Sequence, residues 1–360
     1  MKIASLISAL TLCVAFLVPQ ALRAADIAVT DPLIRYVGRF DRQDAEGPRC
    51  AWTASSVALT ITGGSLNVKL KESGKSFWQV IINGKPGEVL ELRPGEQTYS
   101  VATNLPAGKH TIELFKRTEA AVGVTQILGF QIEDNQKLLP TPGRKHRIEV
   151  IGDSISCGYG NEASKGTEAF TPATQNGWLT YGAIAAREVD ADLVCIAWSG
   201  KKLHGDNSLP DLYDRVLPNP LEPRWDFTSW TPDVVIINLG TNDFRGGNPD
   251  QETWSNAYVE FIRQVRARYP KAPIYVAQGS LMSDWPEDRK PRTTIIGYYP
   301  AIIEKANAAA KADGGPPVHF LDFGVQNRED GYGAHMHPNT KTNAHMGDQL
   351  AKVLKQDLGW

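Results

Sequence analysis

The chain has 360 residues, which is enough for two domains of ordinary size. Its 38 lysines and arginines nearly balance its 40 aspartates and glutamates, so the formal net charge is -2. This balance gives no support to nucleic acid or another polyanion as a partner, and we expect a neutral ligand. Nothing in the composition indicates an oligomeric state.

The first 24 residues have the features of a secretory signal peptide. Lys2 precedes an uncharged stretch over residues 3–22, and small residues around Ala24 form a cleavage site. We therefore expect cleavage after Ala24, a secreted or periplasmic protein, and no membrane attachment once the signal has been removed. A lipoprotein signal ending at Cys13 is the alternative, although Leu12 stands where such a signal requires a small residue.

Three cysteines remain after the predicted cleavage. Cys50, Cys157 and Cys195 are widely separated, so they allow at most one disulfide and do not match the spacing of a zinc site. We expect neither a disulfide framework nor a structural metal.

Short runs of alternating apolar residues predict β-strands in the first part of the chain. The clearest runs cover residues 57–62, 65–70, 78–82 and 110–115. Gly63-Gly64 and Asn83-Gly84 lie between runs or at their ends, where turns require positive φ. The pattern predicts an antiparallel β-sandwich over residues 25–137, followed by a linker rich in proline and glycine over residues 138–146.

Residues 147–360 change to strands that alternate with helices. Compact apolar runs, typical of strands buried on both faces, cover residues 148–151, 193–197, 234–239, 274–277 and 318–321. Apolar stripes with helical spacing occur over residues 254–269 and 346–358. This alternation predicts a parallel sheet with helices on both faces, a three-layer α/β/α domain. In such domains the reactive residues gather at the carboxyl ends of the strands.

Ser154 and His337 are the candidate catalytic pair. Ser154 follows the first predicted parallel strand directly, on a Gly-Asp-Ser turn at its carboxyl end. A serine hydroxyl needs a base to remove its proton, and His337 lies between the last predicted strand and the last helix, on the same sheet edge. A β-turn with a capping serine is the alternative interpretation of the Gly-Asp-Ser turn.

Two further strand ends offer donors for a developing oxyanion. Gly200 follows the second parallel strand and allows a backbone N–H to approach the substrate closely. Asn242 follows the third strand, and its side-chain amide can donate without carrying a charge. A turn glycine and a helix cap are the ordinary interpretations of these two residues. Together with Ser154 and His337, however, they make four candidate residues at successive strand ends, which favours an active site.

These residues resemble the four sequence blocks of the SGNH (GDSL-like) hydrolases, namely Gly152-Asp153-Ser154, Gly200, Gly240-Thr241-Asn242-Asp243 and His337-Pro338. The longer runs at residues 36–40, 108–119 and 152–162 are similar to carbohydrate esterase family 2. The resemblance covers nearly all of the chain beyond the signal. It implies a jelly-roll sandwich in front of an SGNH hydrolase domain, which removes O-acetyl groups from poly- or oligosaccharides without a metal or other cofactor.

The resemblance also assigns roles to individual residues. It makes Ser154 the nucleophile and His337 the general base, and it builds the oxyanion hole from the Ser154 N–H, Gly200 and Asn242. Asp153 and Asp243 belong to the same blocks, and we expect them to hold loops together through their carboxylates.

The chain departs from the family pattern just before His337. The family often has an aspartate two or three residues before the histidine, whereas this chain has Ala334 and His335 at those positions. We expect a backbone carbonyl to orient the imidazole, which would leave a Ser-His dyad. A remote acid, Asp322 or Asp330, is the alternative.

Two other functions fit parts of the sequence. His335 and His337 have the spacing of zinc ligands, and Asp330 is near them in sequence, although a metal there would leave Ser154 without a base. The missing acid also fits a non-catalytic glycan-binding protein with a degenerate hydrolase domain. Trp285 follows the fourth parallel strand and is the aromatic residue that we select as a candidate for stacking on a sugar.

Overall fold

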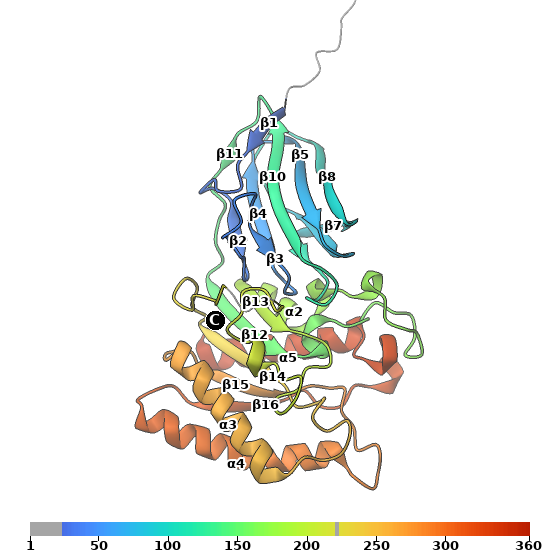
Figure 1. Ribbon diagram of the computed structural model, residues 1–360, viewed down its shortest axis with the longest axis vertical. Helices are drawn as coiled ribbons and strands as arrows, with labels where there is room; N and C mark the ends of the chain where they lie inside the picture. The colour runs from blue at the N-terminus through green and yellow to red at the C-terminus, as the bar shows by residue number, and fades with distance from the viewer. Residues whose placement is uncertain (1–23, 220–222) are drawn as a thin grey trace, which may run out of the picture.

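The computed structural model describes residues 24–219 and 223–360, and it consists of two stacked parts (Figure 1). The N-terminal part is a β-sandwich, and the C-terminal part is a parallel sheet with helices on both faces. Both predictions of the fold class are confirmed. The predicted signal peptide lies outside the described residues, except for Ala24, where strand β1 begins.

The sandwich consists of two antiparallel sheets. The first sheet has the order β1-β10-β5-β8, with β3 also paired to β10, and the second has the order β11-β4-β9-β6-β7, with β2 paired to β4. The bounds in the first sheet are β1 (Ala24–Ile27), β3 (Arg49–Cys50), β5 (Gly64–Glu72), β8 (Gly95–Leu105) and β10 (Thr125–Glu133). Those in the second are β2 (Arg35–Val37), β4 (Ser56–Ile61), β6 (Phe77–Ile82), β7 (Lys85–Glu91), β9 (His110–Lys116) and β11 (Leu138–Leu139).

Alternation along β5 shows why these segments form a sandwich. Leu66, Val68 and Leu70 are buried in the core between the two sheets, while Lys69 and Lys71 point to solvent. A strand with period two therefore covers one face of the core and keeps its charged side chains in water.

One segment of the predicted linker is part of the sandwich. Leu138 and Leu139 form the short strand β11, which pairs antiparallel with Ile61 and Thr60 on β4. An edge strand has unpaired N–H and C=O groups, and the chain leaving the sandwich satisfies some of them.

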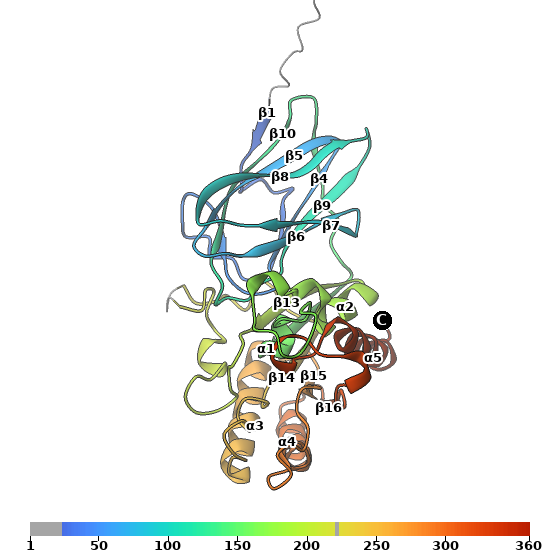
Figure 2. The same cartoon turned by 90° about the vertical axis from the view of Figure 1, so that its right-hand side faces the viewer.

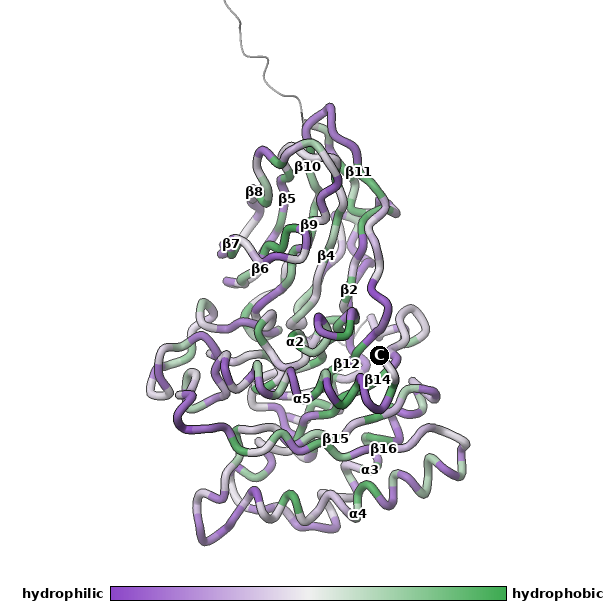
Figure 3. The backbone as a smooth tube through the Cα atoms, turned by 180° about the vertical axis from the view of Figure 1, so that it is seen from behind, coloured by the Kyte–Doolittle hydropathy of each residue, from purple (hydrophilic) through white to green (hydrophobic). Residues whose placement is uncertain are grey.

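The parallel sheet has the order β13-β12-β14-β15-β16, so the first strand in sequence lies inside the sheet. The strands are β12 (His146–Gly152), β13 (Ala191–Ala197), β14 (Val234–Asn238), β15 (Ile274–Gln278) and β16 (Val318–Asp322). All five predicted strands are present, and Figure 3 shows hydrophobic segments along β12 and β14 and hydrophilic segments along many outer turns. The chain passes to opposite sides of β12, and such a switch point places a crevice at the carboxyl ends of the strands.

Helices cover both faces of this sheet (Figure 2). Helices α2 (Tyr181–Glu188) and α5 (Thr340–Leu358) pack on each other on one face, and α3 (Gln251–Arg268) and α4 (Pro291–Ala312) pack on the other. A single turn, α1 (Ser154–Cys157), follows β12. Short 3-10 turns occur at Pro172–Thr174, Gly177–Leu179, Pro210–Leu212, Arg328–Asp330 and Ala334–Met336.

The two parts are joined by buried polar contacts. The fully buried Arg39 of the sandwich lies 3.7 Å from the Glu149 carboxylate on β12. The hydroxyl of Tyr213 donates to the same carboxylate at 2.6 Å. Arg117, at the end of β9, forms an ion pair with Glu162 of the hydrolase part. The strand end near Arg117 therefore packs between the domains.

Among the described residues, no helix is long and apolar enough to cross a membrane. Cys50, Cys157 and Cys195 are buried free thiols, so the structure forms none of the bridges that the sequence permits between them.

Candidate active site

The turn that follows β12 presents Ser154. A Cβ at Gly152 would lie 2.1 Å from the Ser156 hydroxyl, so only glycine fits at this point of the turn. The Asp153 carboxylate accepts a hydrogen bond from the Ile155 N–H at 3.0 Å and caps α1. Ser154 is thus held at the carboxyl end of the sheet, on the strand next to the switch point.

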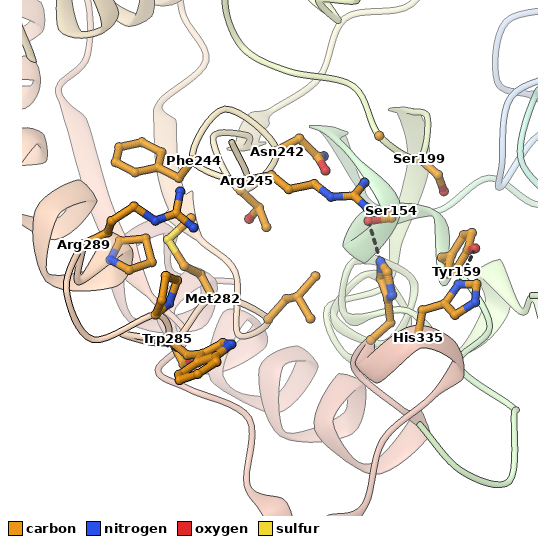
Figure 4. Close-up of a pocket in the computed structure, with 17 residues that line it drawn as sticks. Ser154, Tyr159, Ser199, Asn242, Phe244, Arg245, Met282, Trp285, Arg289 and His335 are labelled. Atoms are coloured by element: carbon orange, nitrogen blue, oxygen red, sulfur yellow. Dashed lines mark hydrogen bonds between the residues drawn. The ribbon is translucent and has the colours of Figure 1, made fainter. Parts of the chain in front are cut away.

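His337 meets Ser154 across 183 positions of sequence. Its Nε2 lies 2.9 Å from the Ser154 Oγ, a contact drawn as a dashed line in Figure 4. Its Nδ1 lies 3.0 Å from the Ala334 carbonyl oxygen. Because a carbonyl only accepts, Nδ1 carries the proton and donates, which leaves the Nε2 lone pair to accept from the serine hydroxyl. The structure brings together the pair that the sequence predicts.

The orienting group is the backbone carbonyl that we expected. The alternative acids are engaged elsewhere, since Asp322 pairs with Arg292 and Asp330 lies 3.6 Å from His345. The structure therefore has a Ser-His dyad.

The loop that carries His337 is fixed by backbone contacts. His335 has φ 50° and Met336 has φ 63°, a left-handed conformation that costs free energy for residues other than glycine. The N–H of Met336 donates to the Gly166 carbonyl at 3.0 Å, and the N–H of Ala334 donates to the Gly160 carbonyl at 2.9 Å. These bonds hold the loop in the conformation that directs His337 at the serine.

Burial lowers the pKa of His337 from its ordinary value of 6.5 to about 4. The backbone around Ala334 and His335 opposes this shift, while the positive charge of Arg245 contributes to it. The Tyr159 ring covers the imidazole at a centroid distance of 4.5 Å. The histidine is therefore neutral, and able to accept a proton, at and well below neutral pH.

Gly200 and Asn242 both line the cavity that contains Ser154. Gly200 has φ 79°, and a Cβ there would meet no atom within 4 Å, so the glycine is required by its backbone conformation and leaves the cavity open. The Asn242 side-chain amide donates to the Lys201 carbonyl at 2.9 Å and to the Asp153 Oδ2 at 3.3 Å.

The two aspartates of the motifs hold loops, as expected. Asp243 accepts hydrogen bonds from the backbone N–H groups of Leu203 at 2.9 Å and His204 at 3.0 Å, and from the Trp254 ring N–H at 3.0 Å. Burial raises the pKa of Asp153 to about 7, and the neighbouring Asp243 adds to this rise.

Sequence reasoning missed the role of Glu119, which reaches this site from the sandwich. Its carboxylate accepts from the Ser199 N–H at 2.7 Å and from the Ser199 hydroxyl at 2.8 Å. Ser199 directly precedes Gly200, so the first domain holds the loop that supplies one predicted oxyanion donor. Burial raises the pKa of Glu119, and the bonds from Ser199 oppose that rise.

The cavity has a volume of about 890 Å³. It brings together Ser154, Gly200, Asn242 and His337, and Trp285 lies at its edge with 77% of its surface exposed. The other lining residues are Tyr159, Ser199, Thr241, Phe244, Arg245, Leu281, Met282, Ser283, Pro286, Arg289, Pro291 and His335. All the site residues predicted from the sequence thus line one cavity.

In the described parts of the chain, no group of three His, Cys, Asp or Glu side chains is arranged to hold a metal ion. The histidine pair considered as zinc ligands has separate partners. His335 Nδ1 lies 3.0 Å from the Tyr159 hydroxyl, while His337 contacts Ser154 and Ala334.

Comparison with known families agrees with this geometry. The description "GDSL-like Lipase/Acylhydrolase family" matches residues 150–345, and "Carbohydrate esterase 2 N-terminal" matches residues 36–142. The chain belongs to carbohydrate esterase family 2. This family 2 esterase is a carboxylic-ester hydrolase, which agrees with the dyad in its cavity.

Individual relatives are similar over most of the chain. A family two carbohydrate esterase from Clostridium thermocellum, solved in complex with cellohexaose, is 36% identical with a TM-score of 0.84, over 91% of this esterase and 99% of that chain. The "Acetylxylan esterase / glucomannan deacetylase" of Cellvibrio japonicus is 26% identical over 93% of this esterase and 91% of that protein. "Cellulase/esterase CelE" of Acetivibrio thermocellus is 36% identical, but the esterase spans only 40% of its length.

Proposed function

We propose that this family 2 esterase removes O-acetyl groups from carbohydrates by a serine acyl-enzyme mechanism. The observation that carries the proposal is the 2.9 Å contact between Ser154 Oγ and His337 Nε2 in a large open cavity. The Cellvibrio japonicus relative, described as an acetylxylan esterase and glucomannan deacetylase, supports acetyl as the acyl group and a poly- or oligosaccharide as the alcohol.

The reaction would proceed in two transfers. Ser154 Oγ attacks the ester carbonyl while His337 Nε2 takes its proton, and the sugar hydroxyl leaves with that proton as the acetyl-serine forms. Water then attacks the acetyl-serine, gives a proton to the same nitrogen, and releases acetate as Ser154 recovers its proton. The Ala334 carbonyl keeps the Nδ1 proton in place during both steps.

The oxyanion would be stabilised by the Ser154 N–H, the Gly200 N–H and the Asn242 amide. The longer Asn242 bond, 3.3 Å to Asp153, is the one that an oxyanion would replace, while the 2.9 Å bond to Lys201 keeps the amide oriented. Each such donor typically lowers the barrier by about 3 to 4 kcal/mol.

Trp285 supports the carbohydrate part of the proposal. Its ring lies exposed at the edge of the cavity, and an indole surface can stack on the apolar face of a sugar ring.

We also propose secretion or periplasmic export. The predicted signal peptide over residues 1–24 and a carbohydrate substrate together favour a site of action outside the cytoplasm.

Acetate release from acetylated xylan and glucomannan tests the function directly. We expect Ser154→Ala and His337→Ala to lose at least about a thousandfold in kcat, because each removes a group that acts as part of a unit. Equal acetate release by the wild type and Ser154→Ala would refute the mechanism. It would favour the alternative function, a non-catalytic glycan-binding protein. Cellohexaose binding by each variant, measured by calorimetry, separates a lost reaction from a lost site.

A further inference from the structure

Two arginines line the cavity that contains Ser154 and His337. Arg245 lies in the loop after β14, and Arg289 lies in the loop between β15 and α4. In Figure 4 the Arg245 side chain extends toward Ser154, and Arg289 lies farther from Ser154, on the side of the cavity where Phe244 is drawn. One cation thus stands near the reacting atoms and the other stands farther along the cavity.

The cavity contains no carboxylate to neutralise these charges. None of its lining residues is an aspartate or a glutamate. In the part of the chain that the structure describes, neither guanidinium has an ion-pair or hydrogen-bond partner. The loop of Arg289 also carries three acidic residues, but none of them lines the cavity, and the Asp284 carboxylate accepts from the Thr293 N–H at 2.7 Å.

This local charge differs from that of the whole chain, whose net charge is -2. A cavity lined by one sign of charge concentrates its field and attracts ligands of the opposite sign. The guanidinium group presents a planar fork of N–H donors that matches a carboxylate in two parallel hydrogen bonds. Because the Arg245 side chain extends toward Ser154, its charge acts close to the reacting atoms (Figure 4).

We propose that the substrate is an acetylated glycan that carries carboxylates, as uronic acids do, and that Arg245 and Arg289 each bind such a group at a different place along the cavity. The inference rests on the deacetylation proposed above and names its substrate class. It replaces the neutral ligand expected from the net charge of the chain, because the charge of the cavity and not that of the whole protein acts on the substrate.

The carboxylate can lie on the acetylated sugar or on a neighbouring one, and two substrates distinguish these cases. Acetylated oligogalacturonides carry it on the same sugar. Acetylated glucuronoxylan oligosaccharides carry it on a side group, and enzymatic removal of that group gives a neutral partner with the same acetyl content. We expect the wild type to show kcat/KM at least about tenfold higher on one acidic substrate than on the neutral partner, since one hydrogen bond to a charged group accounts for that factor.

Arg245→Gln and Arg289→Gln test the binding role. We expect each variant to lose about tenfold or more in kcat/KM on the preferred acidic substrate, mainly through KM, with a much smaller loss on the neutral partner. The preference of the wild type should also weaken as sodium chloride is added. Arg328→Gln is the matched control, because Arg328 is exposed in the same domain and does not line the cavity.

The outcomes separate this inference from the function on which it rests. Equal kcat/KM on the acidic and neutral substrates, or equal losses on both in the arginine variants, would overturn the carboxylate site while leaving a working deacetylase. Absence of Ser154-dependent acetate release from every substrate would instead refute the deacetylase itself.

Discussion

At the residue scale, the main feature of this esterase is an imidazole oriented by a neutral group. The Ala334 carbonyl fixes the tautomer of His337, but its partial charge stabilises the imidazolium less than a carboxylate would. Burial and the nearby Arg245 also disfavour the charged form. The base is therefore easy to keep neutral and comparatively weak as a proton acceptor.

This environment predicts an unusual pH profile. The neutral imidazole is the active form, and its pKa of about 4 lies below the ordinary 6.5. We therefore expect kcat/KM to rise with pH through about pH 4 and to show no further rise near 6.5. Initial rates of acetate release across buffers of constant ionic strength measure the profile.

Removal of the Arg245 charge should shift the pH at which kcat/KM rises. Arg245→Gln takes away a cation that disfavours protonation, so the midpoint should move slightly to higher pH, while burial keeps the pKa of His337 well below 6.5. Arg328→Gln should leave the midpoint in place. If kcat/KM of the wild type rose around pH 6.5 instead, the imidazole would be solvated during catalysis.

The sequence was sufficient to predict that Ser154, His337, Gly200 and Asn242 lie together, because each follows a buried parallel strand and such strand ends converge. It did not indicate roles for Glu119 or Arg245. Glu119 lies in another domain, and no spacing rule connects it to Ser199. Arg245 is an ordinary surface residue by sequence, and only the structure shows that it lines the cavity that contains Ser154.

At the scale of elements, the end of β9 acts on the loop after β13. The Glu119 carboxylate uses both oxygens to hold Ser199, and Gly200 follows at once. A glutamine would keep one acceptor but place an NH₂ group against a donor of Ser199. The carboxylate therefore sets the position of the loop that carries the predicted oxyanion donor.

We expect Glu119→Gln to lower kcat by about tenfold or more with little change in KM. An oxyanion donor stabilises the transition state more than the bound substrate, so its displacement affects mainly the chemical step. Steady-state kinetics on an acetylated oligosaccharide measures the two constants separately. Glu162→Gln is the control, since it breaks the ion pair with Arg117 between the same domains without touching Ser199. Equal kinetic losses in both variants would indicate a general loosening of the interface instead.

Elements with a clean period were predictable, and α4 and β11 show why some others were not. Helix α4 (Pro291–Ala312) contains Pro300 in its interior, which interrupts the helical pattern that marks α3 and α5. Strand β11 consists of two leucines inside a segment rich in proline, and only its pairing with β4 makes it a strand. Tertiary contacts therefore determined the structure in both places.

At the scale of the whole molecule, buried charged groups lie at the interface between the two parts. Arg39 and Glu149 are both fully buried, and the hydroxyls of Tyr213 and Tyr269 donate to the Glu149 carboxylate at 2.6 and 3.1 Å. Burial raises the pKa of Glu149, while Arg39 opposes that rise. We therefore expect folding of the second domain to depend on the first.

We expect Arg39→Met to lower the free energy of unfolding by about 3 to 5 kcal/mol near neutral pH, because it leaves the Glu149 carboxylate buried without its cation. Without Arg39 the pKa of Glu149 should rise further above its unfolded value. A group whose pKa is raised in the folded state contributes stability at low pH, and this contribution is lost as pH rises. The loss in free energy of unfolding caused by Arg39→Met should therefore be smaller at pH 5 than at pH 8. Urea unfolding at the two pH values measures this difference.

The double variant Arg39→Met/Glu149→Gln decides whether the uncompensated charge is the cause. Glutamine keeps an oxygen that can accept from Tyr213 or Tyr269 and removes the charge, so the double variant should recover much of the lost stability and lose the pH dependence. If the single and double variants were equally unstable at both pH values, the loss would come from the packing of the Arg39 side chain, which lies 5.1 Å from the centroid of the Tyr213 ring. In that case the aromatic contacts of Arg39, rather than its ion pair, would hold the sandwich on the hydrolase domain.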